Sequence, residues 1–436
     1  MNTPDSDDVH KELQSGPLKV SGFTPELERN IEAAIDRKER AKPRTKLFLF
    51  IGGLGAISAA VLLFPWGILN TKSDAAAATQ LAASEGPQIV TPAPVSINSA
   101  LLIGLRTEQK STDSVNHAGP LTYSTYRTML IAPVRGKLRK TSEGSGILMP
   151  YKMNFWKIDS LVQKTASDEI HYLSAHLADQ PVKPETFTDD PEEKLNRIET
   201  LLFAGNQYLS IAESEQGTHG KQPYQASRIW VRTLPQLKEG HTLEFYKKPT
   251  DPNHVAVTDV YDPSISGVLN NLSDQHISKD QPMEINGQSW TVERAPGRWV
   301  GKIAQTPLAD STLPDQYILH DWPRDLPDKV VNHDELASTW MDIKTSWPKA
   351  TDALTSPLND MIVIFEEGKL KFYPYGQAPN NDPQLTIDLK PNEKLVMAQW
   401  ATDHYVQEWI DKTAAYLAYA SPAETGGSYN EAGLPN

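Results

Sequence analysis

Short apolar runs separated by turn residues recur along most of this chain and predict β-strands. The clearest stretch is residues 283–303, where the runs MEI, QSWTVER and RWVGKI are separated by Asn-Gly at 286–287 and by Ala-Pro-Gly at 295–297. Asn-Gly between alternating runs is a strong hairpin signal. The pattern therefore predicts a three-stranded meander with two turns.

Further strands follow the same pattern. They are predicted at residues 126–133 before a turn at Arg135-Gly136, at 147–150 with 155–161, at 201–211 around Gly205-Asn206, at 229–234, at 360–365 with 369–375 around Glu367-Gly368, and at 394–400. So many short strands favour a mainly β domain. A β-propeller is the preferred interpretation because it buries repeated small sheets without long exposed edges. A pair of β-sandwiches is the alternative, since no WD or kelch signature repeats.

Helical periodicity is predicted at fewer places. Residues 404–419 place Tyr405, Trp409, Ile410 and Leu417 on or near one face, which indicates a C-terminal helix. Residues 161–177 are also compatible with a helix. Residues 191–202 have a helix-like beginning, but their second half equally fits a strand.

One run differs from all the others, because residues 47–69 (LFLFIGGLGAISAAVLLFPWGIL) are apolar and uncharged throughout. A bilayer core about 30 Å thick needs about 20 apolar helical residues. The run is too long, and begins too late in the chain, for a signal peptide. We therefore expect a single transmembrane helix, with the lipid bilayer as a partner.

Basic residues precede this run and set its expected orientation. They are Arg37, Lys38, Arg40, Lys42, Arg44 and Lys46. Positive charge next to a span stays in the cytoplasm. Residues 1–46 are thus expected inside the cell, and the C-terminal domain outside the cell membrane.

The predicted cytoplasmic tail contains one amphipathic segment, residues 24–38. Leu27, Ile31 and Ile35 recur every four residues and form a narrow apolar stripe on a short helix. A lone helix cannot bury that stripe. A cytoplasmic protein partner is therefore one interpretation, and a weakly formed helix without a partner is the other.

The remaining chain divides by composition. Residues 70–98 are rich in Ala, Ser, Thr and Pro and are interpreted as a linker, 99–420 as the extracytoplasmic β-rich domain, and 421–436 as a flexible tail.

Charge and cysteine content narrow the function classes. The tail contains nine acidic and nine basic residues, so the net charge of −13 belongs to the part after the span. An acidic domain argues against nucleic acid and against anionic lipid as ligands. The absence of cysteine excludes disulfides and thiolate chemistry and favours a bacterial source.

No catalytic, cofactor-binding or metal-binding residue is assigned from the sequence. His171 and His176 are five residues apart, which does not fit a helical ligand pair, and they are interpreted as solvated. Gly144-Ser145-Gly146 lacks the GxSxG pattern. Ser346-x-x-Lys349 matches the S-x-x-K pattern by chance, because Pro348 fits poorly in a helix start. An acidic pair assembled from distant strands remains open.

Tryptophans provide the one ligand-binding indication. They are concentrated in one third of the chain, at Trp290, Trp299, Trp322, Trp340 and Trp347. Aromatic platforms bind glycans and peptides. The alternative is that these indoles fill the β core.

The order of tail, span, linker and outer β domain resembles that of bacterial single-pass sensors and transmembrane anti-sigma regulators. The sequence thus favours a non-catalytic, membrane-anchored binding or sensing domain with no cofactor. The alternatives are an anti-sigma-like signalling regulator whose tail binds a partner, and a cell-surface hydrolase.

Overall fold

The computed structural model describes residues 96–110, 121–164, 169–185, 193–219, 222–238, 254–276, 282–308, 316–376 and 382–418. Chain contacts divide the protein into residues 1–88 and 89–436, and every described residue lies in the second unit. The predicted tail helix, the predicted span and residues 421–436 lie outside the described residues. No helix among the described residues is both long and apolar enough to cross a bilayer.

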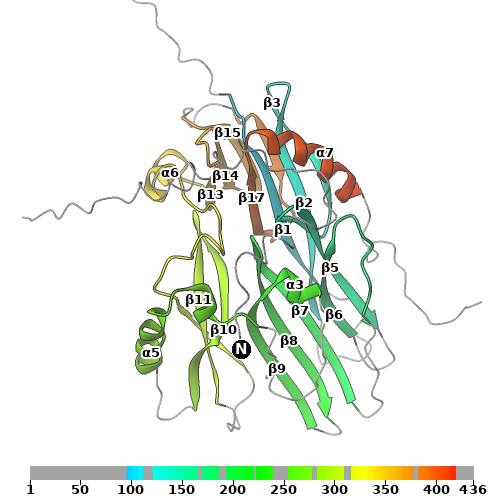
Figure 1. Ribbon diagram of the computed structural model, residues 1–436, viewed down its shortest axis with the longest axis vertical. Helices are drawn as coiled ribbons and strands as arrows, with labels where there is room; N and C mark the ends of the chain where they lie inside the picture. Colours follow the sequence, from blue (N-terminus) through cyan, green and yellow to red (C-terminus); the bar gives the residue numbers. More distant parts are fainter. Residues whose placement is uncertain are drawn as a thin grey trace, which may run out of the picture. The chain divides into compact units, whose positions relative to one another are not determined.

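The described domain is mainly β, and its four sheets are arranged like a four-bladed β-propeller (Figure 1). Sheet A has the order β17-β1-β2-β3, formed by Lys394–Ala401, Ala100–Lys110, Thr122–Val134 and Lys137–Ser145. The first and last strands of the domain are therefore hydrogen-bonded neighbours. Ala100 pairs with Ala401 in an antiparallel register.

Sheet B is the largest sheet, with six strands in chain order. They are β4 (Ile147–Tyr151), β5 (Asn154–Lys164), β6 (Glu169–Leu177), β7 (Glu193–Gly205), β8 (Tyr208–His219) and β9 (Gln222–Thr233). All pairs are antiparallel except β6 and β7, which are parallel over three residues. The short helix α3 (Leu234–Lys238) follows β9 directly.

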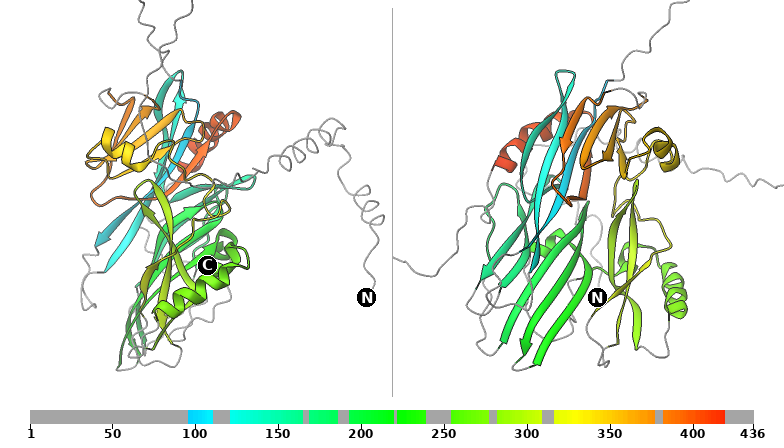
Figure 2. Two further views of the ribbon diagram at one scale, coloured as in Figure 1. Left: turned by 90° about the vertical axis from the view of Figure 1, so that its left-hand side faces the viewer. Right: turned by 180° about the vertical axis from the view of Figure 1, so that it is seen from behind.

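The other two sheets are smaller. Sheet C contains β10 (Met283–Ala295), β11 (Arg298–Pro307) and β12 (Ile318–Asp321), and sheet D contains β13 (Asp352–Thr355), β14 (Met361–Glu366), β15 (Lys369–Pro374) and β16 (Leu385–Asp388). The helices α4 (Val257–Val260) and α5 (Ile265–His276) precede sheet C, α6 (Trp340–Ser346) precedes sheet D, and α7 (His404–Ala418) follows β17 (Figure 2).

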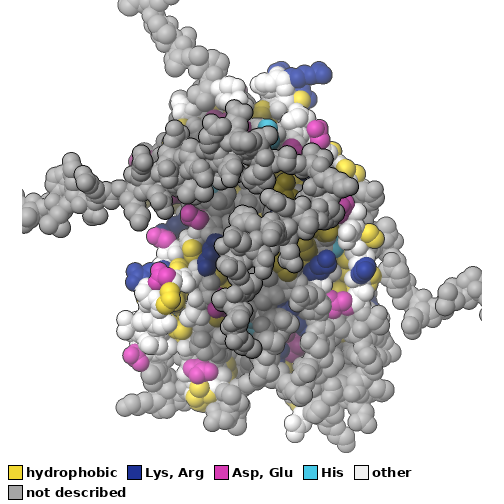
Figure 3. All heavy atoms as spheres, viewed as in Figure 1, with side chains coloured by type: hydrophobic (Ala, Val, Ile, Leu, Met, Phe, Trp, Pro, Cys, Tyr) yellow, Lys and Arg dark blue, Asp and Glu magenta, His cyan; other side chains and the backbone are white. Residues whose placement is uncertain are grey.

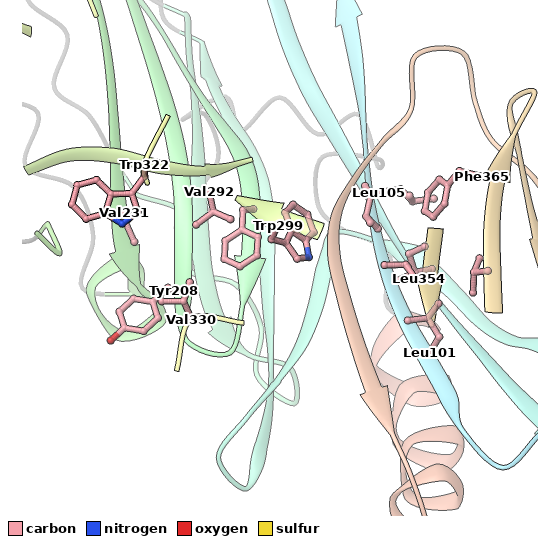
Figure 4. Close-up of a cluster of buried hydrophobic side chains, with 14 of the residues drawn as sticks. Leu101, Leu105, Tyr208, Val231, Val292, Trp299, Trp322, Val330, Leu354 and Phe365 are labelled. Atoms are coloured by element: carbon pink, nitrogen blue, oxygen red, sulfur yellow. The ribbon is translucent and has the colours of Figure 1, made fainter. Parts of the chain in front are cut away.

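One buried cluster receives side chains from all four sheets. Figure 4 shows members of it: Leu101 and Leu105 from sheet A, Tyr208 and Val231 from sheet B, Val292 and Trp299 from sheet C, and Leu354 and Phe365 from sheet D. A second cluster lies between the other face of β1, sheet B and α7. Strand β1 therefore buries both of its faces, which explains why its sequence ALLIGL is apolar without alternation.

Most predicted strands are confirmed, including the hairpins β2–β3, β4–β5, β7–β8 and β14–β15 and the last strand β17. The predicted C-terminal helix is confirmed as α7. A mainly β domain was thus correctly predicted.

Three local predictions were wrong. Residues 161–164 end β5 and residues 169–177 form all of β6 instead of a helix, and Leu161 and Tyr172 face each other across this antiparallel pair. Residues 193–202 belong to strand β7, so the helical interpretation was wrong and the strand alternative for their second half is confirmed. Asn286-Gly287 is not a turn between strands: it lies inside β10, at an irregularity between Ile285 and Trp290, and Gly287 has a φ of 76°. The third strand of that meander is β12.

Candidate functional site

Six polar side chains meet on three neighbouring strands of sheet B, and we call them the charged cluster. They are Arg197 and Glu199 on β7, Glu213 and Glu215 on β8, and Tyr224 and Arg228 on β9. The antiparallel register places Arg197 opposite Glu215, Glu199 opposite Glu213, and Glu213 opposite Arg228. Directly opposite residues point to the same face of a sheet, so the register itself brings these groups together.

The two guanidinium groups hold the three carboxylates by short contacts. Arg197 Nη2 donates to Glu199 Oε1 at 2.9 Å and to Glu213 Oε2 at 2.5 Å. Arg228 Nη1 lies 3.2 Å from Glu213 Oε1 and 2.9 Å from Glu215 Oε2. Glu213 is therefore the central group, because it contacts both arginines.

Hydrogen bonds complete the cluster at its edges. The Tyr224 hydroxyl donates to Glu215 Oε2 at 3.1 Å and accepts from Arg228 Nη2 at 2.8 Å. On the other side, the backbone N–H of Leu173 in β6 donates to Glu199 Oε2 at 2.9 Å. The cluster thus links four strands of sheet B.

Burial sets the electrostatics of the cluster. Arg197, Glu199, Glu213 and Glu215 each expose 5% of their surface or less. Burial raises the pKa of Glu213 above its ordinary value, opposed by Arg197 and reinforced by Glu215. Three carboxylates thus share two guanidinium groups in a buried site.

A second polar group lies on β6 of the same sheet. His171 Nε2 is 2.7 Å from Glu169 Oε1, and its ring stacks on Tyr123 of β2 with the centroids 4.7 Å apart. Burial lowers the pKa of His171, opposed by Glu169. The interpretation of His171 as solvated was wrong, because it exposes only 6% of its surface.

His176, the other histidine interpreted as solvated, is also paired. Its Nε2 lies 2.9 Å from Asp159 Oδ2 on the neighbouring strand β5, and its Nδ1 lies 2.9 Å from the carbonyl oxygen of Leu177. Lys157 Nζ is 3.6 Å from the other oxygen of Asp159. The side chain of His176 exposes 13% of its surface and that of Asp159 only 2%.

The chemistry of these groups is that of paired buried charges. Each carboxylate of the charged cluster accepts from a guanidinium group, which occupies part of its hydrogen-bonding capacity. A general acid or base needs hydrogen-bond reach to a substrate proton. The arrangement therefore supports linking the strands of sheet B more directly than transferring a proton to a ligand.

The five predicted tryptophans divide between two clusters and do not form one platform. Trp290, Trp299 and Trp322 expose 1%, 5% and 6% of their surface and lie in the cluster shared by the four sheets. The Trp290 indole N–H donates to the Val255 carbonyl at 2.7 Å. Trp340 and Trp347 are partly buried against a smaller cluster between α6 and sheet D. A ligand role for any of the five stays a prediction.

The Gly-Ser-Gly and Ser-x-x-Lys motifs lie at the ends of secondary-structure elements. Gly144-Ser145-Gly146 joins β3 to β4, where Thr128 Oγ1 donates to the Gly146 carbonyl at 2.8 Å. Ser346 ends α6, and Lys349 pairs with Glu367 at 2.6 Å. Within the described residues, no group of three or more His, Asp or Glu is arranged to hold a metal ion.

Sequence reasoning missed the charged cluster, although one signal was present. Arg197 and Glu199, and likewise Glu213 and Glu215, are two residues apart, the spacing that places side chains on one face of a strand. The helix-like beginning of residues 191–202 obscured this spacing for Arg197 and Glu199 only.

No protein-family model matches the chain, and no curated protein matches its sequence. The function is therefore argued from the chain itself.

Proposed function

We propose that this protein is a single-pass, membrane-anchored protein of bacteria whose extracytoplasmic domain binds or senses a ligand without catalysis. The C-terminal domain faces outward, and residues 1–46 face the cytoplasm. The anchor is the apolar run at residues 47–69 with its basic flank. The ligand belongs to the neutral or cationic classes, such as a glycan or peptide, that suit an acidic domain.

The observation that carries the proposal is the way the chain enters the β domain. The first described strand, β1, is an inner strand of sheet A, held between β17 and β2. Leu101, Leu102 and Ile103 are fully buried. Two backbone N–H groups just before the strand, those of Asn98 and Ser99, donate to Asp360 Oδ2 at 2.6 and 3.0 Å. The attachment point is thus part of the core.

This construction suits a sensing domain. A change in packing among the four sheets acts on β1, because β1 contributes to both large buried clusters. A ligand that favours one packing of the sheets would therefore act on the strand by which the domain joins the linker at residues 70–98.

The hydrolase alternative draws on the converging carboxylates of sheet B. We favour the non-catalytic function because Glu199, Glu213 and Glu215 are buried and held by Arg197 and Arg228. A signalling role of the tail, with Leu27, Ile31 and Ile35 contacting a cytoplasmic protein, is a second candidate that is compatible with the first. Capture with a peptide of residues 1–46, compared with the same peptide carrying Asp at these three positions, tests that candidate.

The anchor and its orientation are tested by cysteine labelling, since the natural chain contains no cysteine. The full chain is expressed in a bacterial host with Ser21→Cys or Gly136→Cys and treated with a membrane-impermeant maleimide. We expect the protein in the membrane fraction after carbonate extraction, with Gly136→Cys labelled in intact cells and Ser21→Cys labelled only after permeabilisation. Extraction by carbonate, or the reverse labelling pattern, contradicts the proposal.

A further inference from the structure

The end of sheet A at which the chain enters carries an unusual surface for an acidic domain. Leu101 of β1 pairs with Ile131 of β2, so the turn that follows β2 projects from the same end of the sheet as the start of β1. Figures 1 and 2 show β1 beginning at that end, beside the β2–β3 turn. We call this end, with the turns around it, the entry face.

The β2–β3 hairpin makes the entry face basic. Its tip has the sequence Arg135-Gly136-Lys137-Leu138-Arg139-Lys140, and all four basic side chains belong to exposed residues. Figure 3 shows dark-blue side chains gathered over this turn. No described acidic group forms an ion pair with Arg135, Lys137 or Arg139. Lys140 pairs with Glu143.

Exposed apolar side chains lie at the same end. Leu358 exposes 48% of its surface and sits in the turn before Asp360, the residue that holds Asn98 and Ser99. Tyr405 exposes 50% and follows closely after Ala401, which pairs with Ala100. Only five large apolar side chains among the described residues expose 48% of their surface or more, and two of them are here.

We propose that the entry face docks on an anionic lipid surface, with Arg135, Lys137, Arg139 and Lys140 against the lipid phosphates and Leu358 and Tyr405 in the interfacial layer. Basic clusters bind anionic bilayers, and tyrosine is enriched at the membrane–water interface. Acidic groups also lie at this end: Glu143 is held by Arg127 and Lys140, Asp403 is exposed at the start of α7, and the exposed Glu335 lies beside Thr355, the last residue of β13. The turn at residues 135–140 itself contains four basic residues and no acidic residue.

The inference rests on the proposed membrane anchor, because the anchor keeps the domain near a bilayer. A tether of about 29 residues, 70–98, raises the effective concentration of the surface to about the millimolar range. Under those conditions a weak electrostatic contact is sufficient, since each basic residue near an anionic surface strengthens binding about fivefold. The docked domain lies with its entry face toward the membrane.

The test uses the full chain reconstituted in vesicles, with a single introduced cysteine that carries a fluorophore. Gly136→Cys reports on the hairpin tip and Leu358→Cys on the neighbouring turn. Gly368→Cys is the matched control, since Gly368 has nearly the same φ (72° against 74°), an equally open position, and lies at the opposite end of β14 from Asp360. Quenching by a nitroxide-labelled lipid measures proximity to the bilayer.

We expect quenching at Gly136→Cys and Leu358→Cys to be at least about threefold stronger in vesicles with about one third phosphatidylglycerol than in pure phosphatidylcholine. It should return to the phosphatidylcholine level at about 1 M salt, where the Debye length is about 3 Å. Gly368→Cys should show no difference between the two lipids.

Charge variants decide whether the basic residues of the β2–β3 hairpin cause the dependence of quenching on anionic lipid. Replacing Arg135, Lys137, Arg139 and Lys140 by Gln should abolish the lipid dependence. The control variant replaces Lys152, Lys183, Arg298 and Arg324 by Gln. These are exposed residues of sheets B and C and their loops, and the change in net charge is the same. The control should retain the dependence of quenching on anionic lipid. Equal quenching in both lipids, or an equal loss in both variants, overturns the inference. A chain that does not integrate into vesicles at all contradicts the anchor instead.

Discussion

At the scale of single residues, Glu213 is a buried carboxyl group whose pKa is raised. It is buried between Arg197 and Arg228 and beside two further carboxylates. Its raised pKa means that the folded protein holds a proton at pH values where the unfolded chain has released it. By linkage, this contribution to stability is fully present below the ordinary Glu pKa and is lost as pH rises through the raised value.

The variant Glu213→Gln tests this directly, because glutamine is neutral at every pH and similar in shape. We expect the free energy of unfolding of the variant, relative to the natural protein, to increase with pH above the ordinary Glu range. Urea titrations at a series of pH values measure it. A relative stability of Glu213→Gln that does not change with pH would contradict the assigned proton.

Glu143 provides a control, because the expected pH dependence of its contribution to stability has the opposite sign. Its pKa is lowered by Lys140 and Arg127, although burial opposes this. Its contribution is present above the ordinary Glu pKa and is lost as pH falls through the lowered value. Glu143→Gln should therefore destabilise the protein at neutral pH, and the deficit should shrink as the solution is acidified.

At the scale of elements, the docking of α7 on β3 depends on one small residue. A Cβ atom built on Gly144 would lie 2.2 Å from the carbonyl oxygen of Leu417, which is backbone and has little room to move. The same contact region contains the Ser142–Thr413 hydrogen bond at 2.8 Å. The close approach of helix and strand therefore requires glycine at this position.

We expect Gly144→Ala to lower the free energy of unfolding by about 1–3 kcal/mol, the usual cost of overpacking. The matched control is Gly267→Ala in α5, where nothing lies near the added methyl group. That change should stabilise the protein by about 0.5–1 kcal/mol, because alanine favours the helix. Chemical denaturation of both variants provides the comparison, and equal effects would refute the close contact.

A second element-scale feature is the ionic link between sheets C and D. Arg294 of β10 donates to Asp352 of β13 at 2.7 and 3.0 Å, to the Ala353 carbonyl at 2.8 Å, and to Asp334 at 3.0 Å. Burial raises the pKa of Asp334 to about 6, opposed by Arg294. Arg294 therefore bridges two carboxylates, with Asp352 as its bidentate partner.

Removing that partner is expected to be costly. Asp352→Ala should destabilise the protein by about 3–5 kcal/mol, because a buried guanidinium group loses its bidentate partner. Lys349→Ala breaks an exposed pair with Glu367 and should leave the melting temperature nearly unchanged. A small effect of Asp352→Ala in calorimetry would show that water replaces the carboxylate.

Sequence patterns predicted the hairpins well because their information is local. The β14–β15 turn, with Glu367-Gly368 between apolar runs, needs nothing beyond its own residues. The charged cluster could not be predicted in the same way. The six side chains of the cluster come together only through the register of β7, β8 and β9, and that register is set by long-range packing. The helical interpretation of residues 161–177 failed for the same reason, since Leu161 and Tyr172 become neighbours only when two strands pair.

At the scale of the whole molecule, the pairing of the first and last strands makes the C-terminal segment essential. Strand β17 provides one of the two neighbours of β1, and α7 contributes Val406, Trp409 and Leu417 to the second buried cluster. A chain that ends after Lys390 should therefore fail to fold cooperatively, whereas one that ends after Ala418 should melt like the full chain. Retention of a sharp transition by the shorter chain would refute this.

The same strand pairing has a consequence for biogenesis. Because β1 and β17 are nearly 300 residues apart in the chain, sheet A cannot close until the ribosome has made almost the entire protein. A growing chain thus carries one unpaired side of β1 throughout synthesis. The late arrival of its partner therefore delays the closure of sheet A until synthesis has passed Ala401.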